Sequence, residues 1–202
     1  MRRHQRRRGS PERETGEGMS QHPHLFSRYC MHCGQRLISA VPEGDTRRRL
    51  VCFDCGFVHY INPRPVAAVI PVSERGEVLL VRRDIEPRRG TWVFPGGFMD
   101  LGETAEEAAR RETREEAHLE VGELKLLGVY TRTAPGIVLI VYEGQAIGTP
   151  SAGHETSEVA WFAPEAIPWG SLAFDSTVAA LRDWARKHGH PVPDDLPSPA
   201  DL

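Results

Sequence analysis

Short apolar stretches separated by polar turns run through most of the chain and predict β-strands. VAAVIPV at 66–72 and EVLLVRR at 77–83 are rich in β-branched residues, and the turn-forming sequence SERG between them predicts a hairpin. Three later stretches of the same kind are LKLLGVY at 124–130, GIVLIVYEGQAI at 136–147 and EVAWF at 158–162. Because helical segments are mixed with these strands, we expect an α/β domain whose helices cover a sheet.

Two segments have the periodicity of helices. The first begins at Thr104, which has the capping-box spacing to Glu107. The second is VAALRDWARKH at 178–188, for which Asp175 or Ser176 is the expected N-cap.

The first helix places acidic side chains where a core-facing stripe is expected. At 100° per residue, its alanines and its later glutamates share one face: Ala105, Ala108 and Ala109, then Glu112, Glu115 and Glu116. The arginines lie mostly on the other side: Arg110, Arg111 and Arg114. A solvated acidic face, the alternative, would lie opposite the alanines. Carboxylates gathered beside a core have raised pKa values unless a cation neutralises them, and Mg²⁺ combines protein carboxylates with substrate phosphates. We therefore interpret the three glutamates as a divalent-cation site.

The four cysteines form two pairs, one in CMHCG (Cys30 and Cys33) and one in CFDCG (Cys52 and Cys55). This spacing is typical of a tetrahedral zinc site in which each pair supplies two thiolates. Two disulfides or free thiols are the alternative, but the sequence shows neither a signal peptide nor another sign of an oxidising compartment. Four thiolates fill the zinc shell, so we expect a structural Zn²⁺ that folds this small segment.

Composition and charge define the expected segments and exclude few partners. The 202 residues are 40% hydrophobic, enough for one ordinary domain with a small appendage. We expect a disordered basic tail at 1–24, the zinc ribbon at 25–61, the main domain at 62–187, and a disordered Pro- and Asp-rich tail at 188–202. Met19 is an alternative start. A net charge of -3 and the lack of a membrane-spanning apolar run favour a cytoplasmic protein without nucleic-acid or membrane partners. Homodimer formation stays open.

The acidic helix and the loop before it also carry a family motif, the Nudix box. It reads glycine, five residues, glutamate, seven residues, Arg-Glu, an aliphatic residue, any residue, Glu-Glu, any residue, glycine and an aliphatic residue. The chain matches it at Gly97, Glu103, Arg111, Glu112, Glu115, Glu116 and Leu119. Thr113 replaces an aliphatic residue, and His118 replaces the second glycine. If that glycine serves a left-handed turn, His118 costs about 1 kcal/mol there, and neither departure removes a metal ligand.

The chain thus resembles the Nudix hydrolases, which implies a mixed sheet sandwiched between helices after a small zinc ribbon. HYINPRP at 59–65, RRDIEPRRGTWVFPGGF at 82–98 and SLAFDST at 171–177 are similar to a branch that hydrolyses FAD and ADP-ribose. The resemblance therefore implies hydrolysis of a diphosphate bond in one of these nucleotides, with release of AMP. NADH is a weaker alternative, because VYTRTAPGIVL lacks the Ser-Gln-Pro signature of NADH pyrophosphatases. Nucleoside triphosphates are a second alternative, and a catalytically inert nucleic-acid-binding regulator is the alternative from another class.

The resemblance also implies roles for individual residues. Mg²⁺ or Mn²⁺ would be held by the three helix glutamates and by the carbonyl of Gly97, while Arg111 orients the acidic cluster that includes Glu103. The general base would be a box glutamate, Glu155 or Glu158. Candidate substrate-binding residues, for which a solvated surface or core position is the alternative, are Arg83, Arg88 and Phe174.

Overall fold

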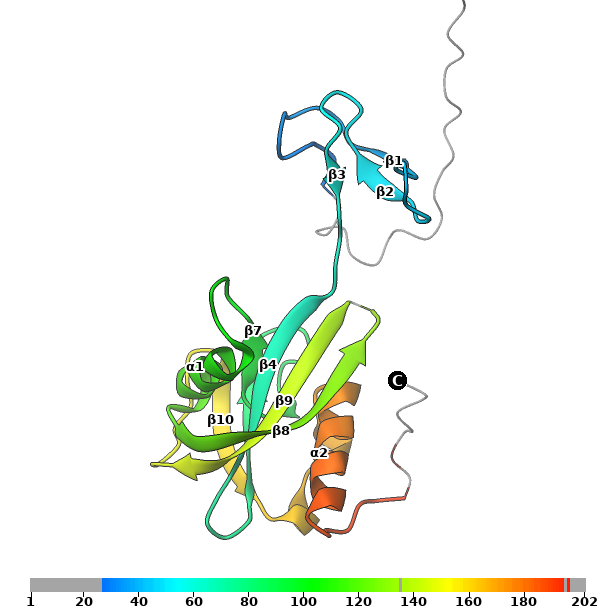
Figure 1. Ribbon diagram of the computed structural model, residues 1–202. Helices are drawn as coiled ribbons and strands as arrows, with labels where there is room; N and C mark the ends of the chain where they lie inside the picture. Colours follow the sequence, from blue (N-terminus) through cyan, green and yellow to red (C-terminus); the bar gives the residue numbers. More distant parts are fainter. Residues whose placement is uncertain (1–26, 135, 195, 197–202) are drawn as a thin grey trace, which may run out of the picture. The chain divides into compact units, whose positions relative to one another are not determined.

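The computed structural model describes residues 27–134, 136–194 and 196 (Figure 1). Contacts between residues divide the chain into two compact units, one ending at Ile61 and the other beginning at Asn62. The tail expected at 1–24 lies outside the described residues. In the described part, no helix is both long enough and apolar enough to cross a bilayer.

The first unit contains a small antiparallel sheet. Its described strands, in the sheet order β1-β2-β3, are β1 (Ile38–Ala40), β2 (Arg49–Val51) and β3 (Val58–His59). Its buried core consists of Cys30, Leu37 and Cys52, with Leu50 and Phe57 packed against them. So few apolar side chains cannot offset the conformational entropy of the unit, which therefore needs a cross-link or a metal ion.

The second unit is built on a mixed sheet whose strands follow the order β10-β5-β4-β9-β8, with β6 paired to β5 and β7 to β4. The described strands are β4 (Arg64–Val72), β5 (Val78–Arg83), β6 (Trp92–Val93), β7 (Gly96–Phe98), β8 (Glu120–Arg132), β9 (Ile137–Ile147) and β10 (Thr156–Phe162). β4 and β9 are parallel, and the other pairs are antiparallel. The predicted hairpin joins β4 to β5 through Ser73, whose N–H donates to the carbonyl of Glu77 at 2.8 Å.

One helix covers each face of this sheet (Figure 1). On β4, Ala67 and Val69 pack in the cluster that contains residues of α1 (Ala105–Ala117). Their neighbours Ala68 and Ile70 pack in the cluster of α2 (Asp175–Lys187). Successive β4 side chains thus point to opposite faces, and because both faces are covered the strand is apolar from Pro65 to Val72. The predicted mixed sheet between helices is confirmed. Two short 3₁₀ helices, η2 (Pro164–Ala166) and η3 (Trp169–Ser171), connect β10 to α2.

α1 has the predicted N-terminus and a left-handed C-terminus. Thr104 Oγ1 accepts from the N–H of Glu107 at 3.2 Å, and Glu107 Oε2 accepts from the N–H of Thr104 at 2.8 Å, which completes the capping box. At the other end, His118 has φ 49° and ψ 37°. Thr113 is fully buried, and its hydroxyl donates to the Ala109 carbonyl at 2.7 Å, so the family's aliphatic position takes a threonine without an unpaired hydroxyl.

The end of the chain differs from the sequence prediction in two ways. α2 begins at Asp175 with Phe174 as its N-cap, and no side chain caps it. The predicted caps Asp175 and Ser176 are therefore wrong, because both residues lie inside the helix and Phe174 takes the N-cap position, with its ring against the guanidinium groups of Arg83 and Arg132. The tail expected from 188 also makes contacts in its first residues: the ring centres of His188 and His190 lie 5.2 and 5.3 Å from that of Trp184. Residues 195 and 197–202 lie outside the described part.

Candidate active site and cysteine cluster

The last turns of α1 lie against β7. Glu116 is buried, and its Oε2 accepts from the N–H of Gly96 at 3.0 Å. A Cβ at position 97 would overlap Oε1 of Glu112 and lie 2.6 Å from its Oε2. Glycine at 97 therefore leaves the space that the Glu112 carboxylate occupies, directly beside the Gly97 backbone.

Arg111 connects the acidic residues of the box. Its Nε and Nη2 donate to the two carboxylate oxygens of Glu103 at 2.6 and 3.0 Å. Its Nη1 donates to Glu112 at 2.7 Å and to Glu115 at 3.2 Å. Arg111 thus reaches the acidic side of the helix, whereas the helical wheel placed the arginines mostly on the other side. The guanidinium holds the pKa of Glu103 down at about 2, and these carboxylates raise the pKa of Arg111.

The buried carboxylates are electrostatically suited to a cation. Burial raises the pKa of Glu116 to about 8, and it also raises the pKa of Glu112. A bound cation would offset this desolvation. In the described part of the chain, only the four cysteines bring three or more candidate ligand atoms within 4.8 Å of one another, so the box carboxylates stand further apart. That spacing still suits Mg²⁺, which takes one or two protein carboxylates and completes its shell with water and phosphate oxygens.

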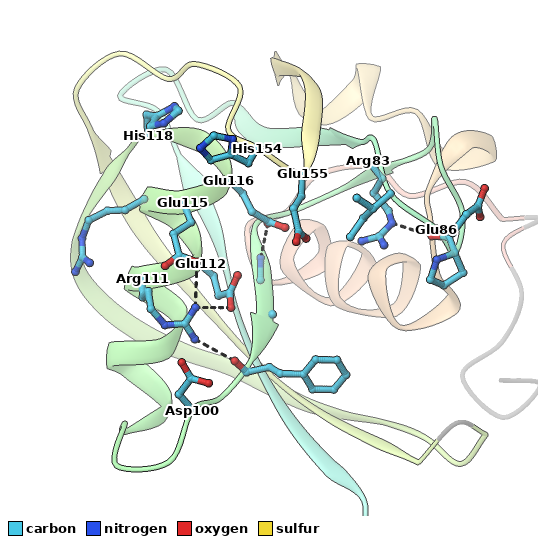
Figure 2. Close-up of a pocket in the computed structure, with 16 residues that line it drawn as sticks. Arg83, Glu86, Asp100, Arg111, Glu112, Glu115, Glu116, His118, His154 and Glu155 are labelled. Atoms are coloured by element: carbon cyan, nitrogen blue, oxygen red, sulfur yellow. Dashed lines mark hydrogen bonds and ion pairs between the residues drawn. The ribbon is translucent and has the colours of Figure 1, made fainter. Parts of the chain in front are cut away.

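These acids open into a pocket of about 790 Å³ (Figure 2). Figure 2 shows Glu112, Glu116, Glu155 and Arg83 directed into the same space. The walls come from α1, β7, the loop after β5 and the loop before β10. The lining residues are Arg83, Ile85, Glu86, Pro87, Gly96, Gly97, Phe98, Asp100, Arg111, Glu112, Arg114, Glu115, Glu116, His118, His154 and Glu155.

The structure brings together most, but not all, of the residues expected at the site. Those that line the pocket are Gly97, Arg111, Glu112, Glu115, Glu116 and Arg83. Glu103 is not in the lining but forms an ion pair with Arg111 at 2.6 Å. Arg88 and Phe174 lie outside the lining. Glu158 is also outside: it is half-exposed on β10 and pairs with Arg82 at 3.3 Å. Of the two acids near β10, Glu155 is therefore the one in the pocket.

Sequence reasoning missed the loop that follows β9 and returns to α1. The N–H of Gly153 and the hydroxyl of Thr156 both donate to the carbonyl of Glu116, at 3.1 and 2.9 Å. The N–H of Ser151 donates to the carbonyl of Ala117 at 2.9 Å. These bonds satisfy helix-end carbonyls that no intrahelical N–H reaches, and they fix the backbone at the C-terminal end of α1. Nothing in SAGHET distinguishes this loop from an ordinary turn.

The four cysteine sulfurs gather in one cluster. The Sγ atoms of Cys30 and Cys55 are 3.7 Å apart, those of Cys33 and Cys52 are 3.5 Å apart, and all four lie within 4.8 Å of one another. A disulfide would hold two sulfurs at about 2.05 Å, whereas a tetrahedral zinc ion with bonds of about 2.3 Å separates them by about 3.8 Å. No disulfide joins these cysteines, so the disulfide alternative is wrong, and the predicted cluster of four sulfurs is confirmed.

We expect purified protein to contain about one zinc ion per chain, because four thiolates close a tetrahedral site. Elemental analysis by mass spectrometry measures the ion directly. Chelation should unfold the small first unit while the second unit, which has a large core of its own, keeps its helical circular dichroism. A metal-free protein whose first unit gives dispersed NMR signals would contradict this assignment.

Comparison with known families agrees with both sites. Residues 62–184 match the family model described as NUDIX domain, and residues 28–61 match the model described as Nudix N-terminal. The chain therefore belongs to the Nudix hydrolase family and carries the zinc ribbon found at the N-terminus of some members.

Individual relatives are of several kinds. An ADP-ribose pyrophosphatase of Methanocaldococcus jannaschii is 38% identical over 128 residues, which are 60% of this chain and 74% of that protein. The NAD-capped RNA hydrolase NudC of Pseudomonas aeruginosa is 27% identical over 144 residues, 70% of this chain and 50% of that one. A crystal structure of a NUDIX hydrolase from Nitrosomonas europaea matches with a TM-score of 0.75 and 36% identity, covering 82% of this chain and 96% of the other. The chain thus spans only about half the length of NudC.

Proposed function

We propose that the protein hydrolyses the diphosphate bond of a nucleoside diphosphate linked to another group, with Mg²⁺ or Mn²⁺ as the required ion. One observation carries the proposal: buried carboxylates with raised pKa values share a pocket with the guanidinium of Arg83. Carboxylates bind a divalent cation, and the cation and the arginine together bind phosphate oxygens.

The residues divide this work between them. Glu112, Glu115, Glu116 and the Gly97 carbonyl would hold the ion, and Arg111 keeps the carboxylates in place. When bound, the ion neutralises charge on the diphosphate and lowers the pKa of a water molecule.

Two residues across the pocket complete the proposed site. Arg83 donates its Nε–H to the Pro87 carbonyl at 3.0 Å, which leaves its terminal nitrogens for a phosphate. Glu155 lines the pocket opposite the box and is the candidate general base, in preference to Glu158.

ADP-ribose is the first candidate substrate, with FAD as the second. The similarity to an ADP-ribose pyrophosphatase extends over 128 residues and supports ADP-ribose. The similarity to NudC supports an NAD-type substrate as the alternative, against which stands the missing Ser-Gln-Pro signature. The similarity to an 8-oxo-dGDP phosphatase from Homo sapiens, 32% identical over 141 residues, is a reason to test other nucleoside phosphates as substrates. An inert regulator is disfavoured, because the metal-binding glutamates of the box are all present.

A substrate panel tests this proposal. The full chain is incubated with Mg²⁺ and, separately, ADP-ribose, FAD, NADH or a deoxynucleoside triphosphate, and released mononucleotide is quantified by chromatography. We expect AMP from ADP-ribose at the highest kcat/KM. Faster turnover of NADH or of a triphosphate would overturn the substrate assignment while leaving the reaction class in place.

A further inference from the structure

Two arginines, Arg83 and Arg132, lie against the ring of Phe174. The Cζ atoms of Arg83 and Arg132 lie 5.3 and 4.4 Å from the centre of the Phe174 ring. The two guanidinium groups are therefore within about 10 Å of each other. Arg88 is also close enough to repel Arg132 electrostatically. Phe174 thus holds Arg132 in place beside Arg83, which lines the metal-site pocket.

This cluster has no carboxylate partner in ion-pair contact. Among the residues that the structure describes, no acidic side chain lies within 4.0 Å of the charged nitrogens of Arg83, Arg88 or Arg132. Their sequence neighbours differ: Arg82 pairs with Glu158, and Arg89 pairs with Asp84. A group of arginines without carboxylate partners, two of them partly buried (Arg83 and Arg132), is an arrangement that an anion would stabilise.

Arg132 also lines a second, smaller pocket of about 260 Å³ between the end of β8 and the start of α2. The remaining lining residues are Val129, Tyr130, Thr131, Ala134, Asp175, Ser176 and Ala179. Besides Tyr130, Thr131 and Ser176 contribute side chains with hydroxyl groups to this lining. No side chain caps the N-terminus of α2, so its positive end faces this region. Asp175 is the one acid among the described residues of the lining, and its charge opposes the effect of burial, which lowers the pKa of Arg132.

We propose that the Arg132 pocket binds a phosphate ester on the 2′ or 3′ oxygen of the ribose in the substrate's ADP unit. This inference rests on the proposed function, because it takes the diphosphate to lie beside Arg83. A phosphate attached to the ribose is separated from the diphosphate by one sugar, which matches the short separation of Arg83 from Arg132. ADP-ribose alone has no such charge. Two kinds of ligand carry a phosphate ester at this position of the ribose. One is a free nucleotide phosphorylated on its ribose, and the other is the 5′ end of an RNA, whose first phosphodiester is on the 3′ oxygen.

A binding measurement tests the pocket without relying on catalysis. Isothermal titration of the full chain compares AMP with adenosine 2′,5′-bisphosphate and adenosine 3′,5′-bisphosphate. We expect at least one bisphosphate to bind about tenfold or more tightly than AMP, since a charge-assisted hydrogen bond to arginine contributes that much. Arg132→Gln should remove most of the difference. Arg75→Gln, at an exposed arginine in the β4–β5 turn that lines neither pocket, should keep it.

Hydrolysis then separates the two sources. The substrates are ADP-ribose, ADP-ribose 2′-phosphate and a short NAD-capped oligoribonucleotide, and the expected result is that Arg132→Gln lowers kcat/KM for one phosphorylated substrate about tenfold more than for ADP-ribose. Preference for the capped oligonucleotide identifies RNA as the source, and preference for the 2′-phosphate identifies a free nucleotide. Equal binding of AMP and both bisphosphates, or equal effects of Arg132→Gln and Arg75→Gln, would overturn the inference. Tighter bisphosphate binding without any hydrolysis would instead overturn only the proposed function.

Discussion

Glu116→Gln is expected to lower kcat for diphosphate hydrolysis at least about a hundredfold at saturating Mg²⁺. The substitution keeps the size of the side chain. The amide oxygen of glutamine can accept the same hydrogen bond from the N–H of Gly96, so the fold is retained. What is lost is the negative charge that a cation would neutralise, on a residue that is only 8% exposed. Steady-state release of AMP measures the effect.

Two further measurements show whether this loss has the proposed cause. Without metal, Glu116→Gln should unfold at the same temperature as the native protein or higher, because a neutral amide carries a smaller burial cost than a carboxylate. Glu106→Gln, on the exposed first turn of α1 and outside the pocket lining, should leave kcat unchanged. Full activity of Glu116→Gln would show that the ion is bound elsewhere.

Gly153→Ala is expected to have the largest effect on stability, a loss of about 2–3 kcal/mol in the free energy of unfolding. A Cβ at this position would overlap the carbonyl oxygen of Glu115, lie 2.9 Å from its carbonyl carbon and lie 3.0 Å from the Cα of Glu116. All three are backbone atoms, so no rotamer change relieves the collision. The loop must move away from α1 and lose the hydrogen bond of the Gly153 N–H to Glu116.

Urea denaturation of the two variants Gly153→Ala and Gly170→Ala measures this difference. Gly170 is the matched control, because a Cβ there meets no atom within 4 Å and its backbone needs no left-handed conformation. Since the loop fixes the end of the helix that carries the box, kcat should also fall in Gly153→Ala. Equal stability of the two variants would mean that the loop does not brace α1.

Local signals in the sequence predicted the parts of the molecule that depend on residues close together in the chain. The capping box at Thr104 fixed the start of α1, and the left-handed residue at His118 was expected from the family's glycine. Paired Cys-X-X-Cys spacings predicted a cluster whose members are 25 residues apart at most, such as Cys30 and Cys55.

Contacts between distant segments could not be predicted in this way. Glu155 and Glu158 look equivalent in HETSEVAWF, but the register of β10 against β5 directs Glu158 to Arg82, whereas Glu155 remains in the loop and lines the pocket. Likewise, Phe174 has no propensity to cap a helix. It is the N-cap of α2 in a fold where its ring packs against Arg83 of β5 and Arg132 of β8, which are distant in the sequence.

The central claim is that the box carboxylates hold a divalent ion with which the protein cleaves a diphosphate bond. Its most direct test is metal-dependent product release from the substrate panel, measured with zinc-loaded protein free of Mg²⁺ and Mn²⁺, after addition of either ion, and after EDTA. We expect no mononucleotide without metal, release on addition of the ion, and loss of release with EDTA. If none of the diphosphate-linked nucleotides is cleaved by folded, zinc-loaded protein with either ion, the account is contradicted.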